Sequence, residues 1–271
     1  MICNTSPSCI CLIVLNISLS NSCKYKLYLV PGVWHPVFVD FILPKPDTNS
    51  TVFDFLVIFC SFCVYSLVPG VWHPVFSARA RHENRFIGHF LCQCVYSLTG
   101  VPVLGVSASK GGSVIAQWQP GGAYLNDTIR RMHATFDFCA AHGIVLRHRF
   151  LLWCQGESDG DHHTAPDVYA EQFCRMYETL RRENIEHCFL IGIGEYNGPA
   201  ADISYDAIRN AQYALADHRS DLTVVSRSFE TMKVRGLMKD AFHYYQAGYN
   251  ETGRTAGEAC AVFVEKSYPL R

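Results

Sequence analysis

The chain has 271 residues, of which 49% are hydrophobic and 17% charged, and its formal net charge is −1. A chain of this length can bury one large core or two smaller ones. The near-zero charge provides no basic field that would attract nucleic acid or an anionic membrane surface. We therefore expect neither a nucleic acid nor a membrane partner, and favour a small neutral or mildly polar substrate.

Cysteine is frequent, with 13 residues of this type. Eight of them lie in residues 1–94, and the other five are scattered through apolar periodic segments, where a free cysteine behaves as a small hydrophobic residue. We interpret these five as reduced core thiols, which favours a reducing, intracellular compartment. They are Cys139, Cys154, Cys174, Cys188 and Cys260.

Residues 1–76 differ from the rest of the chain. They contain only six charged residues, and the stretch "LVPGVWHPVF" occurs twice, at Leu29–Phe38 and at Leu67–Phe76. Solenoid repeats are degenerate and recur several times at one period, so two perfect copies indicate a recent duplication or a misjoined coding sequence. We predict two parts: an atypical segment over 1–76, partly disordered or mis-assembled, and a regular domain over 77–271.

Two apolar runs raise the question of a leader or a membrane anchor. Ile10–Ile17 lacks the preceding positive charge of a secretory signal, and Val52–Val68 is interrupted by Asp54 and has no basic flank. We expect buried strands or a sequence artefact in both places, with a membrane span as the alternative.

From residue 101 the sequence alternates between short apolar runs rich in β-branched residues and amphipathic stretches with helical spacing. This order implies right-handed βαβ crossovers and a parallel sheet with helices on both faces. In chain order, the predicted elements are strand Val101–Ser107, helix 124–142, strand Arg149–Trp153, a helix opening at Pro166, strand Cys188–Gly194, helix Asp206–His218, strand Leu222–Val225 and helix Ala247–Val264.

Polar loops follow the predicted strands. Ligands of such sheets bind outside the carboxyl ends of the strands, so "SASKGGS", "CQGESDG", "GEYNG" and the region leading to "DAFH" should gather at one edge. The crowded polar stretch after Trp153 should therefore face a shared cleft.

These loops carry three features of an acyl-transfer site. Asp240 stands three residues before His243, so its carboxylate could bind one ring nitrogen and leave the other as a base. The amides around Gly111 and Gly112, and the side chain of Gln155, could donate to an oxyanion. Each feature alone has an ordinary explanation, namely a helix cap beside a surface histidine, a turn, and a solvated amide. Together they make up most of a hydrolytic site.

Four segments resemble one known family and occur in its order over roughly residues 99–264: "TGVPVLGVSASKGGSVIAQWQPGG", "FLLWCQGESDG", "DAIRNAQYALA" and "DAFHYYQAGYNETG". The sequence resembles the sialate O-acetylesterase-like branch (carbohydrate esterase family six) of the SGNH hydrolases. The resemblance implies a flavodoxin-like α/β fold, a three-layer sandwich preceded here by an irregular N-terminal segment. It also implies hydrolysis of acetyl esters on a carbohydrate by a serine nucleophile, and we expect no cofactor.

The resemblance also implies roles for individual residues. Carried over by position, these are the general base His243, its partner Asp240, the oxyanion donors Gly112 and Gln155, and the loop-bracing acids Glu157 and Asp159.

The nucleophile is where this sequence departs from the family. Members carry a "G-Q-S-N" loop after their first strand, and no such tetrapeptide occurs here. Ser20 offers the best match, because it precedes an asparagine and follows the run Ile10–Ile17, although Ser18 and Leu19 replace the Gly-Gln pair. Three further serines are poorer candidates because they lie in the segment that matches the oxyanion strand and loop: Ser107, Ser109 and Ser113.

Three hypotheses follow. The chain is an active serine esterase acting on an acetylated carbohydrate, or a catalytically impaired relative that binds a glycan at most, or a metal protein. The third rests on two sets of ligand-type residues: the cluster Asp159, Asp161, His162 and His163, and the pairs Cys60-x-x-Cys63 and Cys92-x-Cys94. We favour it least, because the cluster adjoins Gly160 and is typical of a solvated loop.

Overall fold

The structure, a computed structural model, describes the backbone of four strands within residues 1–86, at 14–15, 27–28, 39–41 and 52–61. It describes the backbone of 87–268 except 101–102 and 142–144, with all side chains of that range apart from those of His89 and Ser107. The candidate nucleophile Ser20, both copies of the repeated decapeptide, Cys63 and the predicted boundary at residue 76 lie outside the described residues.

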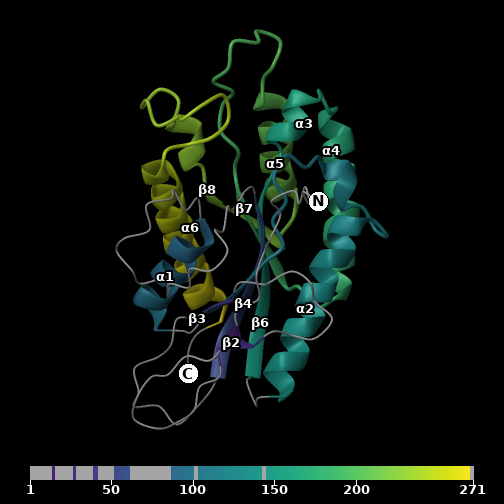
Figure 1. Ribbon diagram of the computed structural model, residues 1–271, viewed down its shortest axis with the longest axis vertical. Coiled ribbons are helices and arrows are strands. Elements are labelled where there is room, and N and C mark those ends of the chain that lie inside the picture. The colour runs from purple at the N-terminus through teal and green to yellow at the C-terminus, as the bar shows by residue number, and fades with distance from the viewer. Residues whose placement is uncertain are drawn as a thin grey trace, which may run out of the picture.

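The six strands of the main sheet follow the order β3-β5-β4-β6-β7-β8. This sheet runs through the centre of the molecule (Figure 1). Five strands run parallel, and β3 pairs antiparallel with β5 at one edge. The parallel sheet predicted from the alternating pattern is confirmed. The strands are β3 (Val39–Phe41), β4 (Val52–Ser61), β5 (Val103–Ser107), β6 (Val145–Cys154), β7 (His187–Ile191) and β8 (Leu222–Ser226), while β1 (Val14–Leu15) and β2 (Leu27–Tyr28) form a separate antiparallel pair.

Helices cover both faces of this sheet, as Figure 1 shows. One hydrophobic cluster joins the sheet to α2, α4 and α5, and a second joins its other face to α1 and α6. The helices are α1 (Ile87–Thr99), α2 (Ala123–Ala141), α3 (Glu157–Asp161), α4 (Pro166–Arg182), α5 (Asp206–His218) and α6 (Gln246–Ser267), with 3₁₀ turns at Ile115–Trp118 and Ser228–Thr231. None of the helices in the described ranges combines the length and hydrophobicity needed to cross a bilayer.

The predicted helices follow their apolar stripes. In α4, Pro166 occupies the first turn, where its missing N–H costs nothing, and the predicted core face is buried. That face consists of Tyr169, Phe173, Met176, Tyr177 and Leu180. The five cysteines expected to be reduced are free thiols, and all but the half-buried Cys174 are buried.

Several boundaries differ from the predictions. The strand expected at Arg149–Trp153 is twice as long, and the one expected to reach Gly194 ends at Ile191. The apolar run from Val52 contributes the central strand β4, and α1 was not predicted. The Asp240–His243 segment forms a turn before α6 rather than the entrance of that helix.

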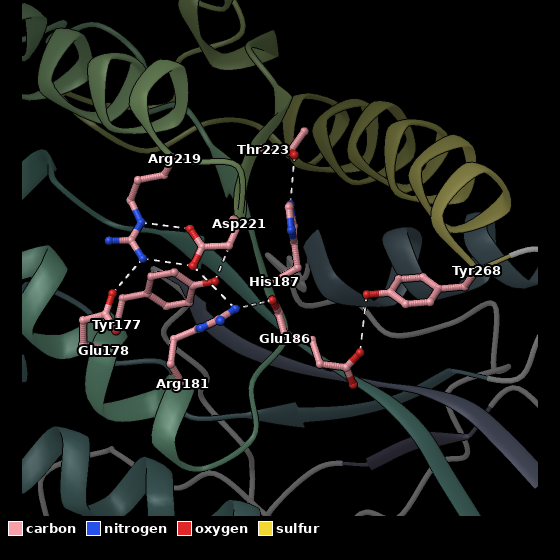
Figure 2. Close-up of polar contacts among 9 residues, drawn as sticks. All are labelled: Tyr177, Glu178, Arg181, Glu186, His187, Arg219, Asp221, Thr223 and Tyr268. Atoms are coloured by element: carbon pink, nitrogen blue, oxygen red, sulfur yellow. Dashed lines mark hydrogen bonds and ion pairs between the residues drawn. The ribbon is translucent and has the colours of Figure 1, made fainter.

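The amino ends of β7 and β8 are held by a polar network (Figure 2). Arg219 forms ion pairs with Glu178 of α4 (2.7 Å) and with Asp221 (2.9 Å), just before β8. Asp221 also lies 3.5 Å from Arg181, and its carbonyl accepts a hydrogen bond from Tyr177 (2.8 Å). This network fixes the end of the sheet opposite to the loops that carry the predicted chemistry.

Candidate active site

The connections of the sheet define where a ligand should bind. From β4 the chain passes to β5 on one side, and from β5 it crosses to β6 on the other side of β4. A doubly wound sheet opens a crevice where its connections diverge in this way. At the carboxyl ends of β4 and β6, Ser61 pairs in register with Cys154, directly before Gln155.

Asp240 and His243 form the pair expected from their spacing. The imidazole Nδ1 lies 2.8 Å from Asp240 Oδ2. The other carboxylate oxygen, Oδ1, accepts backbone N–H groups of His243 (2.8 Å) and Phe242 (3.1 Å). Burial favours the neutral acid, but the hydrogen bonds from the ring and backbone of His243 and from Phe242 outweigh it and hold the pKa of Asp240 below its usual range. The aspartate is therefore an anion that fixes the position of the ring.

The loop that bears this pair is anchored on both sides. Tyr244 is buried directly after the histidine, and its ring stacks on Phe229 at 4.0 Å between centroids. Asn197, in the loop after β7, donates its backbone N–H to Ala241 (2.8 Å) and its side chain to the carbonyl of Asp240 (3.4 Å). The imidazole side chain is 17% exposed, so it lies at the protein surface with a fixed backbone beneath it.

Gly112 lies in the exposed turn after β5. Its φ of +67° is in the left-handed region that glycine adopts without strain, and a Cβ there would meet nothing within 4 Å. The Gly112 N–H makes no hydrogen bond to any residue that the structure describes. This amide can therefore act as a donor to a ligand.

Gln155 is only 4% exposed, and its amide is engaged within the protein. Nε2 donates to the carbonyl of Ser113 (2.7 Å) and to Asp159 Oδ2 (2.5 Å), which accounts for both amide hydrogens. The side chain thus links the end of β6 to the loop that carries Gly112.

Asp159 braces this arrangement. Its carboxylate accepts the N–H of Ile115 (2.9 Å) and the hydroxyl of Thr164 (3.0 Å) in addition to the Gln155 amide. Burial raises the pKa of Asp159, while the hydrogen bonds from Gln155, Ile115 and Thr164 oppose the rise. All three partners are donors, so the ionised form fits the site.

Glu157 has a different environment. It is buried, and Oε2 has no hydrogen-bond partner among the described residues. Burial raises the pKa of Glu157 to about 7, hydrogen bonds from the Glu157 and Gly156 backbone oppose the rise, and the neighbouring carboxylates of Asp161 and Asp159 add to it. An uncharged acid meets the low polarity of this position at the least cost.

Contacts connect the loops in pairs. Gln155 joins the loops after β5 and β6, and Tyr205, just before α5, donates to Asp161 of α3 (2.8 Å). Burial raises the pKa of Tyr244, and the Glu157 carboxylate adds to the rise.

The other candidate residues are placed less favourably. Ser113 is buried, and its hydroxyl donates to the carbonyl of Lys110 (2.9 Å) and accepts the Trp118 indole N–H (3.0 Å). The acidic and histidine residues proposed for a metal do not converge, because Asp159 turns inward while His163 lies 3.7 Å from Asp202. The part of the chain with described side chains holds no group of three metal-ligand residues.

Two features of this edge could not be predicted from the sequence. The register of Ser61 depends on β4 being the central strand, which no local pattern reveals. The contacts of Asn197 are also invisible in sequence, because a single asparagine in "GEYNG" carries no motif.

Solved structures resemble this chain at low sequence identity. A Bacillus subtilis protein matches with a TM-score of 0.50 and 14% identity, over 83% of this chain and 59% of that one. An Arabidopsis thaliana protein matches with a TM-score of 0.48 and 21% identity, over 62% of this chain and 65% of that one. A structure described as a carbohydrate acetylesterase from Xanthomonas citri matches with a TM-score of 0.47 and 15% identity, over 78% and 56%. The chain thus spans less than two thirds of these proteins.

No curated protein matches the chain. The fold is a parallel sheet with helices on both faces, as the resemblance implied. A family model, described as "Carbohydrate esterase, sialic acid-specific acetylesterase", matches residues 89–261, a range that includes Gly112, Gln155, Asp240 and His243. Because this match spans more than half of the chain, the chain belongs to the family of sialic acid-specific carbohydrate acetylesterases.

Proposed function

We propose that this protein removes O-acetyl groups from a carbohydrate through a serine, His243 and Asp240. The observation that carries the proposal is the 2.8 Å contact between His243 Nδ1 and Asp240 Oδ2, with the aspartate itself held by two backbone amides. A carboxylate on Nδ1 keeps the proton on that nitrogen and leaves Nε2 as the base. Family membership supports an acetylated carbohydrate as the substrate.

The reaction proceeds through an acetyl-enzyme. Nε2 of His243 takes the proton of the serine hydroxyl, and the serine oxygen attacks the ester carbonyl carbon. This attack gives a tetrahedral oxyanion. The oxyanion collapses, the bond to the sugar oxygen breaks, and His243 returns the proton to that oxygen. Water, activated by the same imidazole, then releases acetate and restores the serine.

Gly112 is the first donor to the oxyanion, because its N–H lies in an exposed turn. Gln155 is the second. Both of its amide hydrogens are engaged within the protein, so it must release the carbonyl of Ser113 to reach the oxyanion. Such donors typically contribute about 3–4 kcal/mol each to the stabilisation of the transition state.

Ser61 is the nucleophile that the strand topology favours. It ends β4, the central parallel strand, and pairs with Cys154 at the crevice between β4 and β6. Ser20, the candidate from sequence, lies outside the described residues. Of the two, Ser61 is the one whose register position adjoins Gln155.

A second candidate function is glycan binding without turnover. The observation that favours it is the missing "G-Q-S-N" tetrapeptide. Loss of the nucleophile removes most of the rate acceleration of a triad enzyme while the binding groups remain.

A serine-reactive fluorophosphonate probe separates the two. The purified full-length chain is treated with the probe, and the modified residue is identified by peptide mass spectrometry. We expect one modified serine, Ser61, with labelling lost in His243→Ala and in Ser61→Ala. A label on Ser20 would overturn the nucleophile assignment alone, and the absence of any label on folded protein would favour the glycan-binding alternative.

A further inference from the structure

Gln212, on α5, is a fully buried amide that contacts the turn after β6. Its Nε2 donates to the carbonyl of Gln155 (2.6 Å) and to the hydroxyl of Tyr169 (2.9 Å). It therefore bonds directly to the main chain of a proposed oxyanion donor that is 57 residues away in sequence.

Tyr169, on α4, also forms a hydrogen bond to the carbonyl of Gln155, from a second helix. Its hydroxyl donates to the carbonyl of Gln155 (3.0 Å) and accepts the indole N–H of Trp153 (3.3 Å). The carbonyl of Gln155 thus receives two hydrogen bonds, one from α4 and one from α5. Two donors in different directions fix the plane of that peptide.

The peptide between Gln155 and Gly156 packs directly against α5, with no space for a side chain at Gly156. Its φ is +147°, and a Cβ at this position would lie 2.9 Å from both Gln212 Nε2 and Ile208 Cγ2. The chain turns sharply here, directly against α5. The orientation of the Gln155 side chain therefore depends on where α5 holds the turn.

Gln212 is poorly explained as a stabilising core residue. Its Oε1 is buried and has no partner among the described residues. An unpaired buried acceptor costs free energy that an apolar residue of the same size would avoid. All the hydrogen bonds of this side chain to described residues are therefore made by Nε2, at the turn.

We propose that Gln212 is a positioning residue of the esterase site. It holds the carbonyl of Gln155 and so fixes where the Gln155 side chain starts. From there the Gln155 amide bonds Ser113 and Asp159, and on releasing Ser113 it reaches the oxyanion beside the loop that carries Gly112. The inference rests on the proposed function for its catalytic consequence, but its geometric content can be tested without turnover.

The test compares Gln212→Met with a matched control. Methionine has a similar volume and no N–H donor. Thr128→Val, on α2, removes a buried hydroxyl whose one hydrogen bond to a described residue stays within its own helix, to the carbonyl of Tyr124 (2.9 Å). The control reports the effect of losing one buried hydrogen bond in the same helical layer, away from the turn.

Hydrogen exchange measures the geometry. The reporters are the amides of Ile115, bonded to Asp159, and of Gly160, bonded to the carbonyl of Gly156. In Gln212→Met we expect both to exchange about tenfold faster, as loss of about one hydrogen bond allows, while strand β7 is unchanged. Thr128→Val should leave both reporters as in the wild type. Unchanged reporters in Gln212→Met, or an equal change in both variants, would overturn the inference.

Turnover of a chromogenic acetyl ester measures the consequence. We expect Gln212→Met to lower kcat about tenfold or more with little change in KM, because small misplacements of a catalytic group are costly. A rise in KM at constant kcat would contradict a positioning role. A wild-type chain that hydrolyses no acetyl ester would overturn the proposed function, whereas the exchange result would still decide the role of Gln212.

Discussion

Asp240 fixes its histidine through three separate hydrogen bonds. Two come from backbone amides and hold the carboxylate, and the third connects that carboxylate to the ring. Replacement of Asp240 by asparagine can keep the two backbone hydrogen bonds, but it removes the negative charge beside the imidazole of His243. Substitution here therefore tests the electrostatic contribution apart from the fold of the turn.

We predict that Asp240→Asn lowers kcat by about 10²–10⁴-fold with little effect on KM, because an amide at this position favours the wrong imidazole tautomer. Steady-state hydrolysis of an acetyl ester measures it. Asp202→Asn, at a side chain that is 77% exposed, is the control and should retain wild-type rates. Equal activity of the two variants would remove Asp240 from the mechanism.

Glu157 is a buried acid whose folded-state pKa is about 7, against an ordinary value of 4.5. Between these pH values the folded chain keeps the proton and the unfolded chain loses it. Because the unfolded state then binds fewer protons, the free energy of unfolding falls as the pH rises through this window. Above pH 7 both states are ionised and the loss is complete.

Replacing Glu157 with glutamine removes this titration. We predict that the free energy of unfolding of Glu157→Gln, relative to wild type, rises by about 3 kcal/mol between pH 4.5 and pH 7.5. Urea denaturation of both proteins across this range, under reducing conditions, provides the comparison. A difference that stays constant with pH would show that Glu157 does not carry a raised pKa.

Among the elements, α1 and α6 pack with their backbones close together. A Cβ at Gly257 of α6 would lie 2.6 Å from the Cβ of Cys94 and 2.9 Å from the carbonyl of Leu91, both on α1. Gly253, one turn earlier, meets Ile87 and Phe90 in the same way. Two glycines four residues apart thus allow the two backbones to touch.

We predict that Gly257→Ala lowers the free energy of unfolding by about 1–3 kcal/mol, because the helices must separate and repack. The direction is informative, since alanine is otherwise the better helix former. Glu258→Ala, at the next and more exposed position, should change stability by less than about 0.5 kcal/mol. Thermal unfolding of the two variants gives the answer, and a stabilised Gly257→Ala would refute the close packing.

His187, at the start of β7, is a second buried titrating group. It bonds to Thr223 of β8 at 2.9 Å, as Figure 2 shows. Burial lowers the pKa of His187 from 6.5 to about 4. Between these values the unfolded chain binds a proton that the folded chain does not, so the free energy of unfolding falls as the pH is lowered.

For His187→Gln, which does not titrate, we predict that the wild type loses about 3 kcal/mol relative to the variant between pH 7 and pH 4. Denaturation curves at the two pH values measure this loss. The pH dependence of stability that comes from His187 has the opposite sign to that from Glu157, so the two effects partly cancel in the wild type. Each variant removes one of the two titrations and so measures the contribution of that residue alone. A parallel pH profile of wild type and variant would contradict the depressed pKa.

At the scale of the whole molecule, local periodicity predicted the elements that bury a stripe or a run. The helix over Asp206–His218 has the predicted bounds, and the pairing of Asp240 with His243 needs only a three-residue turn. The parallel sheet followed from the alternation of elements, without knowledge of any contact.

Contacts between distant segments could not be predicted in this way. The central position of β4 depends on pairing with β5 and β6, whereas its apolar run alone indicates only a buried strand pair or an artefact. The hydrogen bonds of Gln155 are made to the carbonyl of Ser113, far away in sequence, and to Gln212, in a helix that comes later in the chain. A sequence pattern predicts which face of an element is buried, but not which residues of other elements pack against that face.

We propose that His243 and the Gly112 turn face one reacting serine at the carboxyl edge of the sheet. A crystal structure of the fluorophosphonate adduct tests it most directly. We predict a phosphonyl oxygen about 3 Å from the Gly112 N–H and Nε2 of His243 within hydrogen-bond reach of the modified serine oxygen. An adduct at a serine remote from His243, or an imidazole on another face of the molecule, would contradict the account.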